Sequence, residues 1–153
     1  MNPMSSAAQS RFDRILYLLT WVAALYIAWV FLSNEQYKIL GHPQAIWLFT
    51  LLTDWMHIPG HEKALRLFTA SCEVLSAVLV VIPPTRMYGA VLALGVMTGA
   101  IFFHLASPLG IDPAHDGGKL FTSAILTWLS AVFILIVRRE ELFGLVLQVV
   151  RKT

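Results

Sequence analysis

The sequence predicts an all-α integral membrane protein, a four-helix bundle with a short amphipathic helix in its first outer loop. Of its 153 residues, 58% are hydrophobic and only 13% are charged, whereas charged residues make up about a quarter of a typical soluble domain. The mean hydropathy is +0.70, and four segments approach the roughly 20 apolar residues that a membrane-spanning helix needs. We therefore expect one domain covering residues 1–153, with the lipid bilayer as its main partner.

The predicted spanning helices cover about residues 15–33, 64–82, 87–106 and 119–137. The first has a long apolar core, and no small-x-small cleavage site follows it. It is therefore expected to stay in the protein, unlike a secretory signal peptide. In the third helix, Gly95-x-x-x-Gly99 has the spacing that lets two membrane helices approach closely.

The connection between the first two spanning helices, residues 34–63, is far longer than the 2–8 residues that a helical bundle needs. Within it, residues 44–57 form an apolar segment with one polar stripe at helical spacing, made of Thr50, Thr53, Asp54 and His57, as in an amphipathic helix. Pro43 suits the first helical turn, and Pro59–Gly60 should end the helix. The segment is too short to span a bilayer, so we expect it flat in the outer interface or folded back over the bundle.

Basic residues predict the orientation of the chain. If the four helices simply alternate in direction, seven basic residues lie on one side and four on the other: Arg11, Arg14, Arg86, Arg138, Arg139, Arg151 and Lys152 against Lys38, Lys63, Arg66 and Lys119. The positive-inside rule then places both termini in the cytoplasm. The tail, residues 138–153, is expected to include a short amphipathic helix on that surface, and all five histidines are expected on the outer side. Nucleic acid is not expected as a partner.

Glu73 lies in the middle of the second predicted spanning helix. A carboxylate at this depth costs a few kcal/mol or more, is usually paired, and tends to mark a functional path. Glu73 shares a helix face with Arg66, Thr69 and Ser76. That face should meet protein or water. A site role for Glu73 is favoured, and a purely structural ion pair with Lys38 or Arg66 is the alternative.

His104 follows an apolar run near the outer end of the third helix, and Asp112, His115 and Asp116 crowd the next loop. His104, Asp112 and His115 are candidate metal ligands, although a solvated turn explains the two loop residues more simply. For His104 itself, the alternative is a histidine capped by a loop carbonyl. The sequence has no closed zinc signature and no phosphate-binding loop. Its one cysteine, Cys72, excludes an internal disulfide, and we interpret it as a packed thiol.

The order of these features resembles the DoxX-like family of small four-helix membrane proteins. The resemblance rests on Lys38 after the first helix, Ile58–Pro59–Gly60 after the amphipathic insert, Glu73 in the second helix and His104 in the third, and it covers about residues 14–139. It implies a bacterial inner-membrane protein, often linked to redox processes. Named relatives include a subunit of thiosulfate:quinone oxidoreductase and a mycobacterial membrane oxidoreductase component. The wider group also includes methylamine-utilisation membrane proteins and eukaryotic chaperone or cargo-receptor proteins.

Three functions stay open. The first is a redox-linked subunit acting between a quinone and a membrane or periplasmic oxidoreductase. Its candidate catalytic residues are Glu73, His104 and Lys38, and its candidate cofactor-binding residues are Glu73, His104 and Arg66. The cofactor is not identified: a quinone is favoured over a haem or a metal ion. The second is a non-enzymatic scaffold or assembly factor, in which Glu73 and His104 tie the bundle together. The third is a small metal-handling or transport protein, which would need to form a homo-oligomer.

Overall fold

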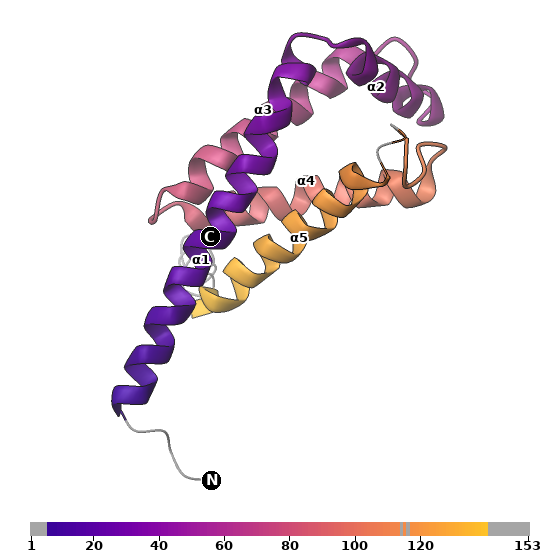
Figure 1. Ribbon diagram of the computed structural model, residues 1–153. Coiled ribbons are helices and arrows are strands. Elements are labelled where there is room, and N and C mark those ends of the chain that lie inside the picture. The colour runs from indigo at the N-terminus through magenta and orange to yellow at the C-terminus, as the bar shows by residue number, and fades with distance from the viewer. Residues whose placement is uncertain (1–5, 114, 116, 141–153) are drawn as a thin grey trace, which may run out of the picture.

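The computed structural model describes residues 6–113, 115 and 117–140, and the regular structure within these ranges is entirely helical. The helices are α1 (Ser6–Ile39), α2 (Pro43–Trp55), α3 (Glu62–Val81), α4 (Arg86–Ala106) and α5 (Lys119–Val137) (Figure 1). All except α2 are long and apolar enough to cross a membrane. The all-helical class and the four candidate spans agree with the sequence prediction.

The ends of the first two helices differ from the prediction. Helix α1 is longer at both ends than residues 15–33 and continues as far as Ile39. Helix α2 begins at Pro43, where the Nδ1 atom of His42 accepts a hydrogen bond from the Gln44 backbone N–H at 3.4 Å. It ends at Trp55 because His57 and Gly60 both adopt positive φ angles, of 59° and 83°. Most of the predicted tail helix falls on residues 141–153, outside the described residues.

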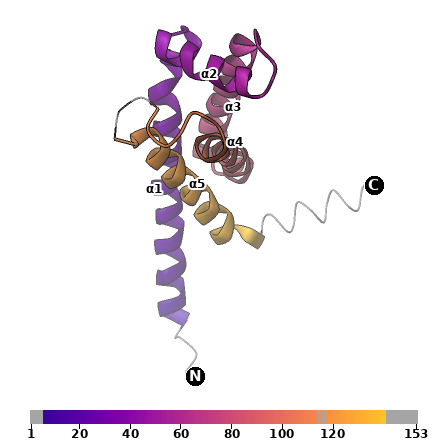
Figure 2. The same cartoon turned by 90° about the vertical axis from the view of Figure 1, so that its right-hand side faces the viewer.

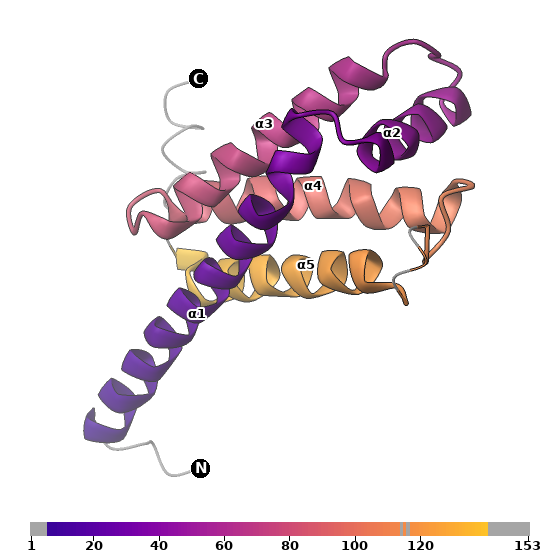
Figure 3. The same cartoon turned by 45° about the horizontal axis from the view of Figure 1, so that its top comes forward.

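The four long helices form a ring in which α1 contacts α3 and α5, and α4 contacts the same two helices. Helix α2 lies at one end of this ring, beside the end of α1 and the start of α3, and packs mainly on α3 (Figure 2). We call this the α2 end. At the opposite end, the first turns of α1 extend beyond the other helices (Figure 3). The core inside the ring is rich in alanine, with Ala24, Ala77, Ala90, Ala93 and Ala131 all buried, and small residues of this kind let membrane helices approach closely.

Helices α3 and α4 form a hairpin that is most tightly packed at Gly89. A Cβ atom on Gly89 would lie 2.4 Å from the backbone nitrogen of Val80, and the Ser76 hydroxyl donates a hydrogen bond to the Gly89 carbonyl oxygen at 2.8 Å. At Gly95 and Gly99, by contrast, a Cβ atom would meet no atom within 4 Å from the other described elements. The spacing of these two glycines permits a close helix contact, but within the described part of this chain the close contact lies at Gly89.

Arg86 holds the turn between α3 and α4 against α1. Its side chain is fully buried, and its Nε–H donates to the Val80 carbonyl oxygen at 3.0 Å. One terminal nitrogen donates to the Thr20 hydroxyl at 3.3 Å, and the guanidinium carbon lies 3.9 Å from the centre of the Trp21 ring. These contacts fix the end of the bundle opposite α2.

Candidate functional site

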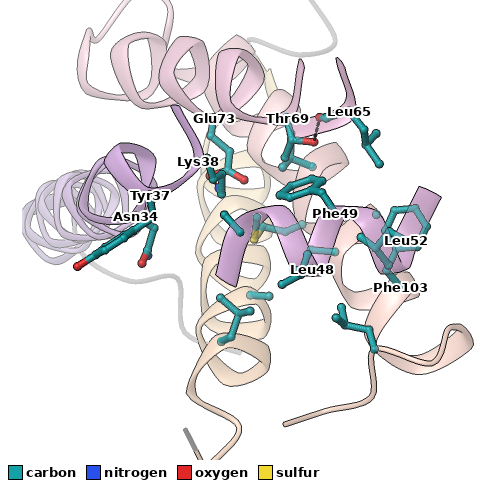
Figure 4. Close-up of a pocket in the computed structure, with 18 of the residues that line it drawn as sticks. Asn34, Tyr37, Lys38, Leu48, Phe49, Leu52, Leu65, Thr69, Glu73 and Phe103 are labelled. Carbon is teal, nitrogen blue, oxygen red and sulfur yellow. Dashed lines mark hydrogen bonds and ion pairs between the residues drawn. The ribbon is translucent and has the colours of Figure 1, made fainter. Parts of the chain in front are cut away.

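A cavity of about 510 Å³ lies at the α2 end of the bundle. Its walls come from the last turns of α1, one face of α2, the first half of α3, the second half of α4, the start of α5 and the loop before it. Figure 4 shows α2 crossing this space with Leu48, Phe49 and Leu52, and Phe103 approaching from α4. The walls are mainly apolar, so the few polar groups among them stand out.

Three of those polar groups are the candidate catalytic residues, Lys38, Glu73 and His104. They come from α1, α3 and α4, and each was singled out for a separate reason in the sequence. The structure brings all three into the wall of one cavity. Figure 4 shows Lys38 and Glu73 next to each other.

Lys38 lies between two buried carboxylates. Its ammonium donates a hydrogen bond to Glu35 Oε1 at 3.1 Å and a second to Glu73 Oε2. Each carboxylate side chain is only 6% exposed and the lysine side chain 18%. Glu35 and Lys38 are three residues apart on α1, so they share a helix face, whereas Glu73 comes from the middle of α3. Of the two predicted partners for Glu73, the structure pairs it with Lys38.

Arg66 does not line the cavity, although it was a predicted cofactor-binding residue. Its Nε–H donates to a carboxylate oxygen of Glu62, and a terminal nitrogen donates to the backbone carbonyl of Lys38. The side chain is buried, and its terminal nitrogens would lie 3.6 Å from a Cβ atom on Gly41. Arg66 therefore joins the start of α3 to the end of α1, two segments that contribute to the wall of the cavity.

His104 has one ring nitrogen committed to the protein. Its Nδ1 lies 2.6 Å from the carbonyl oxygen of Gly110, and the ring packs beside Phe121 with centroids 5.3 Å apart. A carbonyl oxygen only accepts hydrogen bonds, so Nδ1 carries the hydrogen, and Nε2 is the acceptor of the neutral ring. The histidine thus bonds to a loop carbonyl after α4, as the alternative interpretation of His104 predicted, while it also lines the cavity.

The structure does not assemble the predicted metal site of His104, Asp112 and His115. Among the described residues, no group of three or more His, Cys, Asp or Glu side chains could hold a metal ion. The reason is local: His104 Nδ1 is turned toward Gly110, and Asp112 Oδ1 accepts from the Gly118 backbone N–H at 3.3 Å. Asp116 lies outside the described residues.

Sequence reasoning missed Glu35, because it ended the first helix at Ser33 and assigned Glu35 to the loop. A helical spacing was nevertheless present, since Phe31, Glu35 and Lys38 recur at i, i+4 and i+7. Cys72 also lines the cavity, half-buried beside Glu73. His57 and His61 are exposed.

The cavity and its polar groups are the basis for assigning a function. Comparison with known proteins reveals no relative: the chain matches no protein-family model, and no curated protein or solved structure matches it significantly.

Proposed function

We propose that this chain is a multi-pass inner-membrane protein whose cavity binds a quinone, and that it acts as a redox-linked subunit beside a membrane or periplasmic oxidoreductase. The redox link is what its resemblance to the DoxX-like family implies. One observation carries the proposal: Lys38, Glu73 and His104 converge from three helices on a single, mainly apolar cavity. In this proposal, α2 lies at the outer interface and both termini are cytoplasmic, as the distribution of basic residues favours.

The cavity suits a flat ring that carries carbonyl groups. Small-molecule sites are typically clefts of about 300–1,000 Å³ with apolar walls and a few placed polar groups, and this cavity measures about 510 Å³. Apolar side chains such as Phe49 and Phe103 offer surfaces against which a ring can stack. The Lys38 ammonium is a hydrogen-bond donor, and His104 Nε2 is the ring nitrogen left over after Nδ1 has bonded to Gly110. These groups would hold the carbonyl or hydroxyl oxygens of the ring.

Each residue has a distinct part in this chemistry. A bound quinone supplies the two-electron redox couple, and the partner oxidoreductase supplies or accepts the electrons. Lys38 would orient the ring by donating a hydrogen bond from its ammonium to a ring oxygen. Glu73 holds Lys38 in place and exchanges protons with it through their hydrogen bond. His104 accepts a proton at Nε2 from a ring hydroxyl, or returns one when its ring is charged.

Quinone retention tests the proposal. The protein is purified in mild detergent from its native membrane, its lipids are extracted, and the quinone in the extract is measured against the amount of protein. We expect a near-stoichiometric quinone in the wild type and a loss of most of it in Glu73→Gln. In His104→Asn, the side-chain amide can still donate to the Gly110 carbonyl, but the Nε2 position is lost, so retention should also fall.

Two matched controls make the result specific. Asp54→Asn removes an exposed carboxylate on α2, and His61→Asn removes an exposed ring at the start of α3; neither residue lines the cavity. Both controls should retain quinone at the wild-type level. A wild-type protein without quinone, or equal retention in all variants, would contradict the proposal.

A scaffold function is the second candidate, and the links between α1 and α3 favour it. Lys38 contacts Glu73 through its side chain and Arg66 through its carbonyl, which is an arrangement that also serves stability alone. In that case Glu73→Gln should lower the melting temperature and the recovery of a partner protein together, with no quinone in any sample. In the quinone-binding case, the variant loses its quinone while it still folds and still recovers its partner.

A further inference from the structure

The cluster formed by Glu35, Lys38 and Glu73 has an uneven count of charges. If all three side chains are ionised, two negative charges face one positive charge, so the cluster has a net charge of −1. The Arg66 guanidinium touches the cluster only at the backbone carbonyl of Lys38, and its charge is paired with that of Glu62. Within the described part of the chain, the ion pairs of the cluster therefore include no second positive charge.

Burial makes such an excess charge expensive. Both carboxylate side chains are 6% exposed, and an unpaired ion in a low-dielectric interior costs far more than a paired one. Glu35 shows the deficit directly: its Oε1 receives the Lys38 hydrogen bond, but its buried Oε2 has no hydrogen-bond partner within the described part of the chain. Two carboxylates that compete for one ammonium cannot both be stabilised as anions.

We propose that Glu35 and Glu73 together hold one exchangeable proton, which makes their cluster with Lys38 a proton-binding site of the α2 end. With that proton, the cluster is neutral: one carboxylate pairs with Lys38, and the other side chain is a carboxylic acid. The proton replaces the missing positive charge without a metal ion.

The use of this proton rests on the proposed function. Lys38 lines the cavity and donates hydrogen bonds to both carboxylates, whereas Glu35 does not line it, so Lys38 can pass the proton of either carboxyl group to a bound ring oxygen. The Lys38 ammonium gives one proton to that oxygen and becomes an amine. It then takes a proton from the carboxylic acid of the pair, so one O–H bond breaks and one N–H bond forms. A hydronium ion from the solvent then reloads the carboxylate and leaves water, and no electron moves in these steps.

Infrared spectroscopy of the full chain in lipid vesicles at neutral pH, after removal of quinone, tests the proton directly. A protonated carboxyl group has a C=O band that is separate from the carboxylate bands and shifts in deuterium oxide. We expect this band in the wild type and its loss in both Glu35→Gln and Glu73→Gln, because either variant leaves one carboxylate to pair with Lys38. In Lys38→Met the band should grow about twofold, since both carboxyl groups then lack a cation. Asp54→Asn should match the wild type.

Three outcomes would overturn the inference: a wild type without the band, a Glu35→Gln variant that keeps it at full intensity, or a band that sodium ions remove. The second would mean that burial alone protonates Glu73, and the third that a metal cation occupies the site. The two glutamine variants preserve side-chain size, so they decide the question even if Lys38→Met does not fold. Because no quinone is present in this experiment, its result is independent of the quinone-retention test. The carboxyl band can be absent although the protein retains quinone, and it can be present although the protein does not.

Discussion

The backbone of Gly89 on α4 lies directly against that of Val80 on α3, so close that a Cβ atom on Gly89 would fall 2.4 Å from the Val80 nitrogen. The Ser76 hydroxyl on α3 stabilises the same contact by donating a hydrogen bond to the Gly89 carbonyl oxygen. Together with the short turn at Pro83–Pro84, this contact makes α3 and α4 a fixed hairpin. Glu73 lies on α3 and His104 on α4, so the geometry of the hairpin sets the distance between these two residues across the cavity.

Gly89→Leu should strongly destabilise the protein. The added side chain would meet backbone atoms that cannot rotate away, and overpacking of this kind costs about 1–3 kcal/mol or more. The melting temperature in detergent, followed by circular dichroism, checks this. Gly95→Ala is the control, because its new Cβ atom meets nothing within 4 Å, and it should melt at or slightly above the wild-type temperature. Equal melting of both variants would argue against the close contact.

A larger side chain at Gly99, in the wall of the cavity, should abolish ligand binding without unfolding the protein. Gly99 lines the cavity and has open space beyond its Cα atom, so the side chain of Gly99→Leu can enter the space that a ligand needs. We expect quinone retention to fall at least about tenfold, which corresponds to about 1.4 kcal/mol of binding free energy. Val91→Leu enlarges an exposed residue on the same helix outside the cavity and should retain quinone normally. Normal retention by Gly99→Leu would place the ligand elsewhere.

The single cysteine of the chain is a built-in reporter of cavity occupancy. Cys72 lines the cavity and is partly exposed, so a small apolar maleimide should label it in quinone-depleted protein and should label it more slowly when a soluble short-chain quinone is added. A matched control moves the thiol by one position, to an exposed site outside the cavity, in Ser71→Cys with Cys72→Ser. Its labelling rate should not respond to quinone. Equal protection of the two thiols would show that the quinone acts on the lipid or detergent around the protein.

Arg66→Gln should separate the role of this arginine from ligand binding. The change removes a buried charge from its contacts with Glu62 and the Lys38 carbonyl, and breaking a buried ion pair costs about 3–5 kcal/mol. We expect a lower melting temperature but an unchanged affinity for quinone in the fraction that remains folded, measured by fluorescence quenching at low temperature. A weaker affinity with normal stability would restore Arg66 as a ligand-binding residue.

The architecture was predictable from the sequence because hydropathy is a local property. Apolar runs located all four long helices, and Pro43 and Pro59–Gly60 bounded the amphipathic one. The ion pair between Lys38 and Glu73 was only one of two alternatives, since the choice between Lys38 and Arg66 depends on how α1 and α3 pack. Glu35 was missed because a polar residue at the end of an apolar run is typical of a loop.

The spacing of Gly95 and Gly99 did not locate the close helix contact, because that contact also depends on how the helices pack. The pattern at Gly95 and Gly99 shows only where a helix surface is flat, and a flat surface serves equally for contact with another helix or for the wall of a cavity. Here it is the cavity wall. The tight contact occurs at Gly89, which has no partner glycine at the motif spacing; its spacing to the buried Ala93, two small residues four apart, is the sequence signal that could have marked it.

The hydrogen bond from Arg66 to the Lys38 carbonyl joins the two ends of the segment 39–65, which therefore forms a closed loop. Helix α2 lies within that loop and contributes one face to the wall of the cavity. Because the ends of this loop are joined, α2 can change in sequence or length, and with it the size of the ligand that the cavity admits, while the cluster of Glu35, Lys38 and Glu73 keeps its geometry.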